Sequence, residues 1–432
     1  MGQLDLVCQP DYMIGLIGSA TFVGWALMTL VIPPMADKYG RRNIFLVTSL
    51  VAAIIMAAQL ILAKNIYVTF VLMLLIGMTF PGNTSIAFVY MCEFLTPDQQ
   101  VVFSTVCMFF DCTVFLQFTI YYWLVTNNYI WLTSFGAILT IVGTLGAYFF
   151  MPESPLWLLT TNQHDKAHES IKKILDFNGV PHSKEDIQRE LEQDEFNECK
   201  SGRPSNQQES DDELISRESS NTKLTNNSLA SSISVSAETE IFFYLRNWDI
   251  RVNLGVMSYV WSAYSFSVYL LYGQLKYLPG NIYHNAIAVA SAQLTACVVA
   301  GLITKRTGLK CAMSFMFACS LAGGLLILLS EKISEKNLMP LFVLLTKFGI
   351  TGLGVIAYTS SVQLFPTLFS GTAIGICNLL CRVLTISAFV IAEMEPPIPI
   401  SILILVHFLG FFLVQFIRTE IKGSPAQPKK SD

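Results

Sequence analysis

About eleven apolar stretches of roughly 20 residues restrict what this sequence can fold into. They cover residues 13–35, 44–63, 67–92, 101–124, 129–150, 252–272, 284–303, 311–330, 338–361, 369–392 and 398–418. Each is long enough to cross a hydrocarbon layer of about 30 Å as a helix. Because 53% of the residues are hydrophobic and only 13% are charged, a water-soluble fold could not cover so much apolar surface. The sequence therefore predicts an all-α polytopic membrane protein.

A hydrophilic stretch of about 100 residues separates the fifth apolar run from the sixth. We therefore expect an N-terminal helical bundle over 1–150, a cytosolic loop over 151–250, a C-terminal six-helix bundle over 251–420 and a cytosolic tail over 421–432. Within the loop, Ala167, Ile171, Ile174 and Leu175 recur at helical spacing before Gly179, which predicts an amphipathic helix. The Ser-, Asn- and acid-rich segment 198–238 has the composition of a disordered chain.

The short loops orient the predicted bundle. Lys and Arg gather in the loop "DKYGRR", in "TKRTGLK" and in the C-terminal tail, which the positive-inside rule assigns to the cytosol. The large loop and the C-terminus then lie in the cytosol and the N-terminus lies outside. The net charge of −4 indicates no nucleic-acid partner, because most of the acidic residues fall in the large loop.

Motifs of catalysis and of cofactor binding are not found in the sequence. There is no "GxxxxGK[ST]" loop and no catalytic-triad context, so we expect neither an enzyme nor a cofactor. The cysteine pairs in the apolar runs lack nearby His or acid clusters, and they are interpreted as small hydrophobic residues rather than as a metal site. His164 and His168 lie one helical turn apart, and we favour a solvated helix face over a metal pair there.

The loop "PPMADKYGRRN" after the first apolar run combines charges of both signs with a glycine that permits a tight turn. Asp37, Gly40, Arg41 and Arg42 form a candidate gating motif, which can hold one helix bundle against another and release it. Two further acids are assigned to the same motif, Glu93 at the end of the third run and Glu153 in "MPESPLWLL". The alternative is that these cations only anchor the helix end at the cytosolic surface.

Four stretches together resemble the organic anion/cation transporter family of solute carriers, within the major facilitator superfamily. "ADKYGRR" is similar to the superfamily's loop motif, and "PESPLWLL" is similar to the family's "PESPRWLL", with Leu156 in place of Arg. "VQLFPT" resembles the family's "AELFPT", with Gln363 in place of Glu, and "LPGNIYHN" also fits. The resemblance covers nearly the whole chain, and it implies a two-bundle fold in a multi-pass protein of the plasma membrane.

The resemblance also implies that the first of the usual twelve helices is missing here. "QLDLVC" looks like the end of the large extracellular loop that follows helix one in this family, so the eleven predicted spans correspond to helices two to twelve. Cys8 would then have lost its usual disulfide partners. Family members use helix one to line the substrate path, so transport by this chain is in question.

Three ionisable residues lie within apolar runs, where charge is costly and marks a cavity or a partner. They are Asp111, Lys347 and Arg382. One interpretation is a buried ion pair that only fixes packing, for example between Asp111 and one of the two cations. The other is a substrate site. The resemblance implies that Arg382 stands where the anion-transporting branch carries Arg, and a guanidinium binds carboxylates bidentately.

Aromatic residues supply the remaining candidates for the substrate site. Tyr259, Tyr264 and Tyr269 lie in the run 252–272 with Trp261, Phe266 and Tyr272, and the run 101–124 adds Phe109, Phe110 and Phe115. Rings with polar tips suit bulky organic ions. Facing lipid is an equal alternative for each of them.

These observations predict a secondary active or facilitative transporter of small organic ions, with organic anions favoured, that works by alternating access in the lipid bilayer. A counter-ion or an exchange substrate would be its further partner. Two alternatives stay open. The first is an organic-cation or sugar carrier of the same superfamily, and the second is a non-transporting shortened form that regulates a full-length relative.

Overall fold

The computed structural model of the chain is built from α-helices, because a backbone in lipid must satisfy its own hydrogen bonds. It describes residues 11–63, 65–126, 128–161, 163–179, 246–333, 338–365 and 367–418, and no strand occurs among them. In the N-terminal part the helices are α1 (Asp11–Thr29), α2 (Ile32–Tyr39), α3 (Arg41–Leu62), α4 (Ile66–Phe80), α5 (Ala87–Cys92), α6 (Pro97–Ile120), α7 (Tyr129–Phe150), α8 (Pro155–Thr160) and α9 (His164–Asn178). In the C-terminal part they are α12 (Trp248–Gln274), α13 (Ile282–Thr307), α14 (Leu309–Ile333), α15 (Met339–Leu364), α16 (Thr367–Ala392) and α17 (Ile398–Leu413).

The all-α membrane fold is confirmed. Within the described residues, 10 helices are long and apolar enough to cross a membrane, so the protein is an integral multi-pass membrane protein. The predicted span 101–124 is also a helix, α6, but its apolar part is the shorter stretch Phe109–Val125. The span 13–35 was predicted too long. Helix α1 ends at Thr29, and the separate α2 begins with Pro33 and Pro34 in its first turn, where a missing amide donor costs nothing.

We call the helices α1 to α7 the N-group. Within it, α1 and α4 pack closely because small residues let their backbones approach. A Cβ atom on Gly77 of α4 would collide with the Thr21 backbone of α1. Gly24 of α1 meets α4 in the same way, 2.9 Å from the Met78 amide nitrogen for an added Cβ. Helix α3 in turn packs on α4 and α7.

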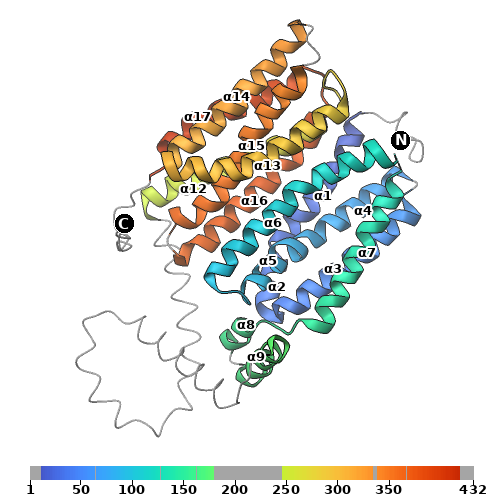
Figure 1. The fold of residues 1–432 in the computed structure, drawn as a ribbon, viewed down its shortest axis with the longest axis vertical. Helices are drawn as coiled ribbons and strands as arrows, with labels where there is room; N and C mark the ends of the chain where they lie inside the picture. Colours follow the sequence, from blue (N-terminus) through green and yellow to red (C-terminus); the bar gives the residue numbers. More distant parts are fainter. Residues whose placement is uncertain are drawn as a thin grey trace, which may run out of the picture. The chain divides into compact units, whose positions relative to one another are not determined.

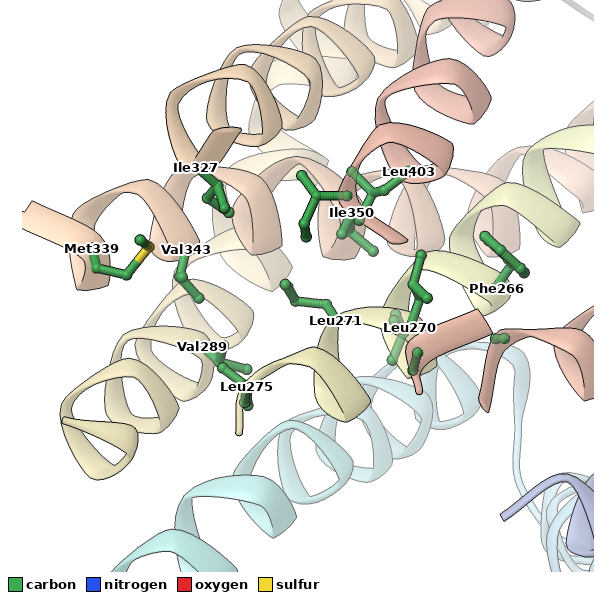
Figure 2. Close-up of a cluster of buried hydrophobic side chains, with 14 residues drawn as sticks. Phe266, Leu270, Leu271, Leu275, Val289, Ile327, Met339, Val343, Ile350 and Leu403 are labelled. Carbon is green, nitrogen blue, oxygen red and sulfur yellow. The ribbon is translucent and has the colours of Figure 1, made fainter. Parts of the chain in front are cut away.

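The six helices α12 to α17, the C-group, lie together (Figure 1), and buried side chains from these helices form an apolar core. Figure 2 shows side chains from α12 to α15 and α17 converging there, including Leu271, Val289, Ile327, Val343 and Leu403. Three tyrosines of α12, Tyr264, Tyr269 and Tyr272, pack against this core at its edge. The core therefore fixes the position of an aromatic helix face.

Two helix pairs join the N-group to the C-group, α1 with α16 and α6 with α13, and Figure 1 shows these helices side by side. In the middle of α1, Ser19 Oγ donates to the Ile386 carbonyl at 2.7 Å, and Gly18 lies against the Phe389 ring. Just after α6, Trp123 stacks on Tyr283 at 6.0 Å. Relative to Trp25 and Arg382, both contacts lie toward the membrane face that the loop charges predict to be outside, which we call the outer half. At these two points the helix groups close against one another in the outer half.

The segment from Pro152 to Asn247 forms a second compact unit. Its described part begins with α8, where Ser154 Oγ accepts from the Trp157 amide at 3.2 Å. Trp157 and Leu158 of α8 pack on the buried Ala167 of α9. The amphipathic helix expected in this loop is confirmed as α9, and it ends at Gly179 in the left-handed conformation with φ of 67°.

The predicted domain boundaries themselves remain predictions. Segment 198–238, the tail 421–432 and Cys8 lie outside the described residues.

Close packing between α1 and α4 generates a stability prediction. We expect Gly77→Ala to lower the free energy of unfolding by about 1–3 kcal/mol, because the added methyl group meets the Thr21 backbone and cannot be accommodated by a side-chain movement. Gly143→Ala on α7 is the matched control, since nothing lies within 4 Å of its added Cβ. Thermal unfolding of the purified variants measures the difference, and equal midpoints would contradict the packing described.

Candidate functional site

The three ionisable residues of the apolar runs lie on three helices, Asp111 on α6, Lys347 on α15 and Arg382 on α16. Lys347 is only 1% exposed and Arg382 is 9% exposed, while Asp111 is exposed. The Asp111 carboxylate interacts electrostatically with both cations. Among the described residues, however, no ion pair within 4 Å joins it to either of them. The structure therefore contains two buried cations and a neighbouring carboxylate without a closed pair.

The ammonium group of Lys347 is held by an aromatic and amide cluster. Its Nζ donates to the Tyr272 hydroxyl at 3.1 Å and lies 4.2 Å from the centre of that ring. The Tyr272 hydroxyl donates to Gln293 Oε1 of α13 at 3.0 Å, and Phe115 of α6 stacks on the Tyr272 ring at 4.4 Å. These contacts attract the cation through a ring face and an oxygen, but they do not neutralise it.

The guanidinium of Arg382 lies on the face of Trp25 of α1, with 3.6 Å between its central carbon and the ring centre. Its Nε donates to Asn378 Oδ1 at 3.2 Å, and the phenol of Tyr269 of α12 lies near enough to interact electrostatically with it. The indole nitrogen of Trp25 is buried and has no hydrogen-bond partner among the described residues. A buried donor without a partner is uncommon in proteins, and here it adjoins the guanidinium.

Aromatic rings from both helix groups connect the two cations. Phe22 of α1 packs edge-on against Tyr269 at 4.5 Å, and Tyr269 lies 5.6 Å from Phe389 of α16 and 6.2 Å from Tyr272. Tyr264 packs against the same apolar core as Tyr269 and Tyr272. We call Asp111, Lys347, Arg382, Trp25 and the tyrosines at 264, 269 and 272 the central cluster.

Not every predicted aromatic residue belongs to the central cluster. Tyr259 points to α17, where its hydroxyl donates to the Val406 carbonyl at 2.7 Å. Phe115 contacts the central cluster by stacking on Tyr272, but Phe109 and Phe110 are 56% and 61% exposed. The role of each of these residues as a substrate contact remains a prediction.

The central cluster offers ionic and aromatic chemistry. Arg382 keeps guanidinium donors for a carboxylate, the ring faces suit apolar or cationic groups, and Asp111 suits a cationic group. Among the described residues no group of three or more His, Cys, Asp or Glu could hold a metal ion. The arrangement therefore fits the binding of a small organic ion.

The residues of the candidate gating motif form a second polar cluster at the α2–α3 turn, and their gating role stays a prediction. Arg41 forms an ion pair with Asp37, and its Nε lies 3.2 Å from Glu93 Oε1. Arg42 donates to the Tyr148 carbonyl of α7 at 2.6 Å. Gly40 joins α2 to α3 with φ of 101°, a conformation that favours glycine. The turn thus places Arg41 between acids of α2 and of the segment after α5.

Glu153 belongs to the second compact unit, before α8. Its carboxylate accepts from the Ser154 amide at 3.1 Å, and its carbonyl accepts from Ser170 Oγ of α9 at 2.6 Å. Its assignment to the gating motif stays a prediction.

Two groups of helices around a central charged and aromatic cluster are typical of a transporter that changes access between the two membrane faces. A model of the family described as "Major Facilitator Superfamily" matches residues 9–390. The chain belongs to this superfamily.

Curated relatives place the chain nearer to one set of its members. It is 26% identical over 384 residues to mouse (Mus musculus) "Solute carrier family 22 member 21", and 25% identical over 392 residues to human (Homo sapiens) "Organic cation/carnitine transporter 2". Both alignments cover 88% of this chain and 61% of the relative, so the chain spans about three fifths of the relatives' length. The resemblance to solute carriers of organic ions is thereby confirmed.

Solved structures with the same fold include that of the xylose transporter XylE from E. coli in a "partially occluded inward open conformation". The TM-score is 0.66 at 14% identity, over 96% of this chain and 89% of that one. A second XylE structure, bound to a bromo-deoxyglucose, gives a TM-score of 0.62 at 13% identity, over 94% of this chain and 86% of that one. At these identities the likeness shows the fold alone.

Sequence reasoning did not find Trp25, Gln293 or the contact between Cys112 and Cys297. Trp25 lies one turn beyond Phe22 on the same face of α1, a spacing that could have marked it as facing a partner. Its position over Arg382 depends on the α1–α16 contact, which no local pattern reports.

The gating cluster gives the second prediction. Glu93→Gln should lower the free energy of unfolding by about 1–3 kcal/mol, because the Arg41 guanidinium, 17% exposed, would lose one of its two carboxylate partners. Glu169→Gln on α9 breaks the ion pair with Lys173, whose side chains are 62–67% exposed, and should change stability by less than about 1 kcal/mol. Thermal unfolding of both variants in lipid nanodiscs measures the contrast, and a smaller loss for Glu93→Gln than for Glu169→Gln would refute it.

Proposed function

We propose that the protein is a secondary transporter of small organic ions that carry a carboxylate, and that the central cluster binds them. The observation that carries this proposal is the pair of buried cations, Lys347 and Arg382, without a carboxylate within 4 Å in the described parts of the chain. A buried cation is costly unless it is paired, and a ligand carboxylate would supply the missing charge. Anions and zwitterions both satisfy this condition.

Relatives support a zwitterion as one member of the substrate class. Carnitine, which appears in the names of several of them, carries a carboxylate and a quaternary ammonium group. In this chain, Asp111 and the ring faces around it would accept the ammonium end, while Arg382 would bind the carboxylate.

Contacts between the helix groups support alternating access as the mechanism. Ser19 with Ile386 and Trp123 with Tyr283 close the outer half beyond the central cluster. A rocking movement that separates these contacts would open the central cluster to the outside. The driving force would be a counter-ion, an exchange substrate or the substrate gradient, and the membrane would be the plasma membrane.

The third prediction concerns Arg382. Arg382→Gln should weaken the binding of para-aminohippurate, an anion, and of carnitine by about tenfold or more, because a charge-assisted hydrogen bond is worth about 1.5–3 kcal/mol. Binding of tetraethylammonium should stay unchanged or tighten. Calorimetric titration of the purified chain in nanodiscs measures all three probes.

Two further variants make this test specific. Arg382→Lys keeps the charge and should retain part of the affinity for the two carboxylates. Arg306→Gln removes a cation at the cytosolic end of α13 and should change none of the three affinities. Unaltered binding of both carboxylates to Arg382→Gln would reject the proposed role of Arg382.

A second candidate function, transport of organic cations, is favoured by the exposed Asp111 beside the ring faces and by the relatives' names.

The fourth prediction separates the two candidates. If the site serves carboxylate-bearing ions, Asp111→Asn should leave para-aminohippurate binding intact or tighter, because a neighbouring negative charge is removed. Carnitine should then lose affinity by about three- to tenfold. If the site serves cations, wild-type protein should bind tetraethylammonium but neither carboxylate, and Asp111→Asn should abolish that binding. The same titration distinguishes these patterns.

A further inference from the structure

Two cysteines from different helix groups meet in the middle of the protein. Cys112 of α6 is buried and Cys297 of α13 is half-buried, and their Sγ atoms lie 2.8 Å apart. Both are free thiols in the structure. Gln293, one turn before Cys297, connects this thiol pair to the central cluster through Tyr272.

Other cysteine contacts in the described parts of the chain stay within one helix group. Cys377 of α16 contacts Ser258 of α12, and Cys381 donates to the Asn378 carbonyl of its own helix. Such contacts are what buried thiols ordinarily make as small hydrophobic residues. The pair Cys112–Cys297 differs because it connects two surfaces that alternating access must move relative to one another.

The position of Cys112 along α6 decides which part of the α6–α13 contact a disulfide would hold. Cys112 precedes Trp123, which stacks on Tyr283, by about 16 Å of helix at 1.5 Å per residue. A disulfide holds its two Cα atoms within about 4.4–6.8 Å and its two sulfurs at about 2.05 Å. It would therefore fix α6 against α13 at Cys112 and Cys297, so that the two helices could neither part nor slide there.

We propose that Cys112 and Cys297 are a redox-sensitive latch, in which a disulfide holds the outer half closed and arrests the transport cycle. The latch rests on the proposed transport function, but formation of the bond is tested without it. A diffusible peroxide is the oxidant and a small thiol is the reductant.

The chemistry balances in two steps. One thiolate attacks a peroxide oxygen, the O–O bond breaks, and a sulfenic acid and one water form after proton transfer. The second thiol attacks the sulfenic sulfur and expels a second water, so two thiols and hydrogen peroxide give one disulfide and two waters. Lys347 interacts electrostatically with both sulfurs and would stabilise the attacking thiolate. Two molecules of glutathione return the thiols and leave glutathione disulfide.

A split-chain assay tests whether the bond forms. A protease site inserted within residues 205–235 allows the chain to be cut between the two cysteines after membranes are treated with hydrogen peroxide and the remaining thiols are blocked. On a non-reducing gel the cut, oxidised wild type should keep its full-length mobility, and dithiothreitol should separate the halves. Cys112→Ser and Cys297→Ser should separate in both conditions. Cys319→Ser on α14 is the matched control and should stay linked. Separation of the oxidised wild-type halves would overturn the proposal.

A second assay tests whether the bond arrests the outer half. Tyr283→Cys places a reporter thiol at the outer end of the α6–α13 contact, and a membrane-impermeant maleimide added from outside reads its opening. Peroxide treatment should slow this labelling at least tenfold, dithiothreitol should restore it, and adding Cys297→Ser should remove the effect. The latch would be refuted if the disulfide-linked chain were labelled as fast as the dithiothreitol-reduced chain. Failure of all three probes to bind, with linkage and slowed labelling intact, would instead refute the proposed function alone.

Discussion

Two cations in the membrane interior, without a closed ion pair, organise the rest of this protein. Lys347 and Arg382 are almost fully buried on neighbouring helices, and each is accommodated by a ring face and a neutral oxygen rather than by a carboxylate within 4 Å. These contacts lower the energetic cost of burying each charge, but they do not neutralise it. The apolar core of α12 to α17 has to position Tyr269 and Tyr272, and α1 has to bring Trp25 over Arg382, for either cation to be tolerated. Fold and binding chemistry therefore depend on the same contacts.

The sequence was sufficient for the parts that depend on local composition. Apolar runs near 20 residues predicted the membrane helices because lipid admits few other backbone structures, and the boundaries of α7 were predicted to the residue. The predicted span 13–35 was wrong because it treated residues 30–35 as the end of one helix. In the structure the two prolines lie in the first turn of a new helix, α2. An ionisable residue within an apolar run stands out whichever helix face it occupies, and this identified Lys347, Arg382 and Asp111.

Contacts between segments far apart in the chain could not be predicted from the sequence. Nothing near Trp25 indicates Arg382, more than 350 residues away by the chain numbering. Tyr259 and Tyr269 lie on the same helix, yet Tyr259 donates to a carbonyl of α17, whereas Tyr269 packs against Phe22 of α1 and Phe389 of α16. The packing of α12 against both α16 and α17 decides this difference. A pattern on one helix states which residues share a face, but not which helix covers it.

Small residues decide how closely α1 approaches its neighbours on both sides. On α1, Gly24 admits the backbone of α4, and an added Cβ on Gly15 would lie 2.7 Å from the Phe389 carbonyl oxygen of α16. Gly18 instead receives the ring of Phe389. Helix α1 therefore makes close backbone contacts both with its own group and with α16, and the hydrogen bond from Ser19 to Ile386 adds to the second contact. Under the proposed transport cycle, any separation of α1 from α16 would have to break this hydrogen bond and would carry Trp25 away from Arg382.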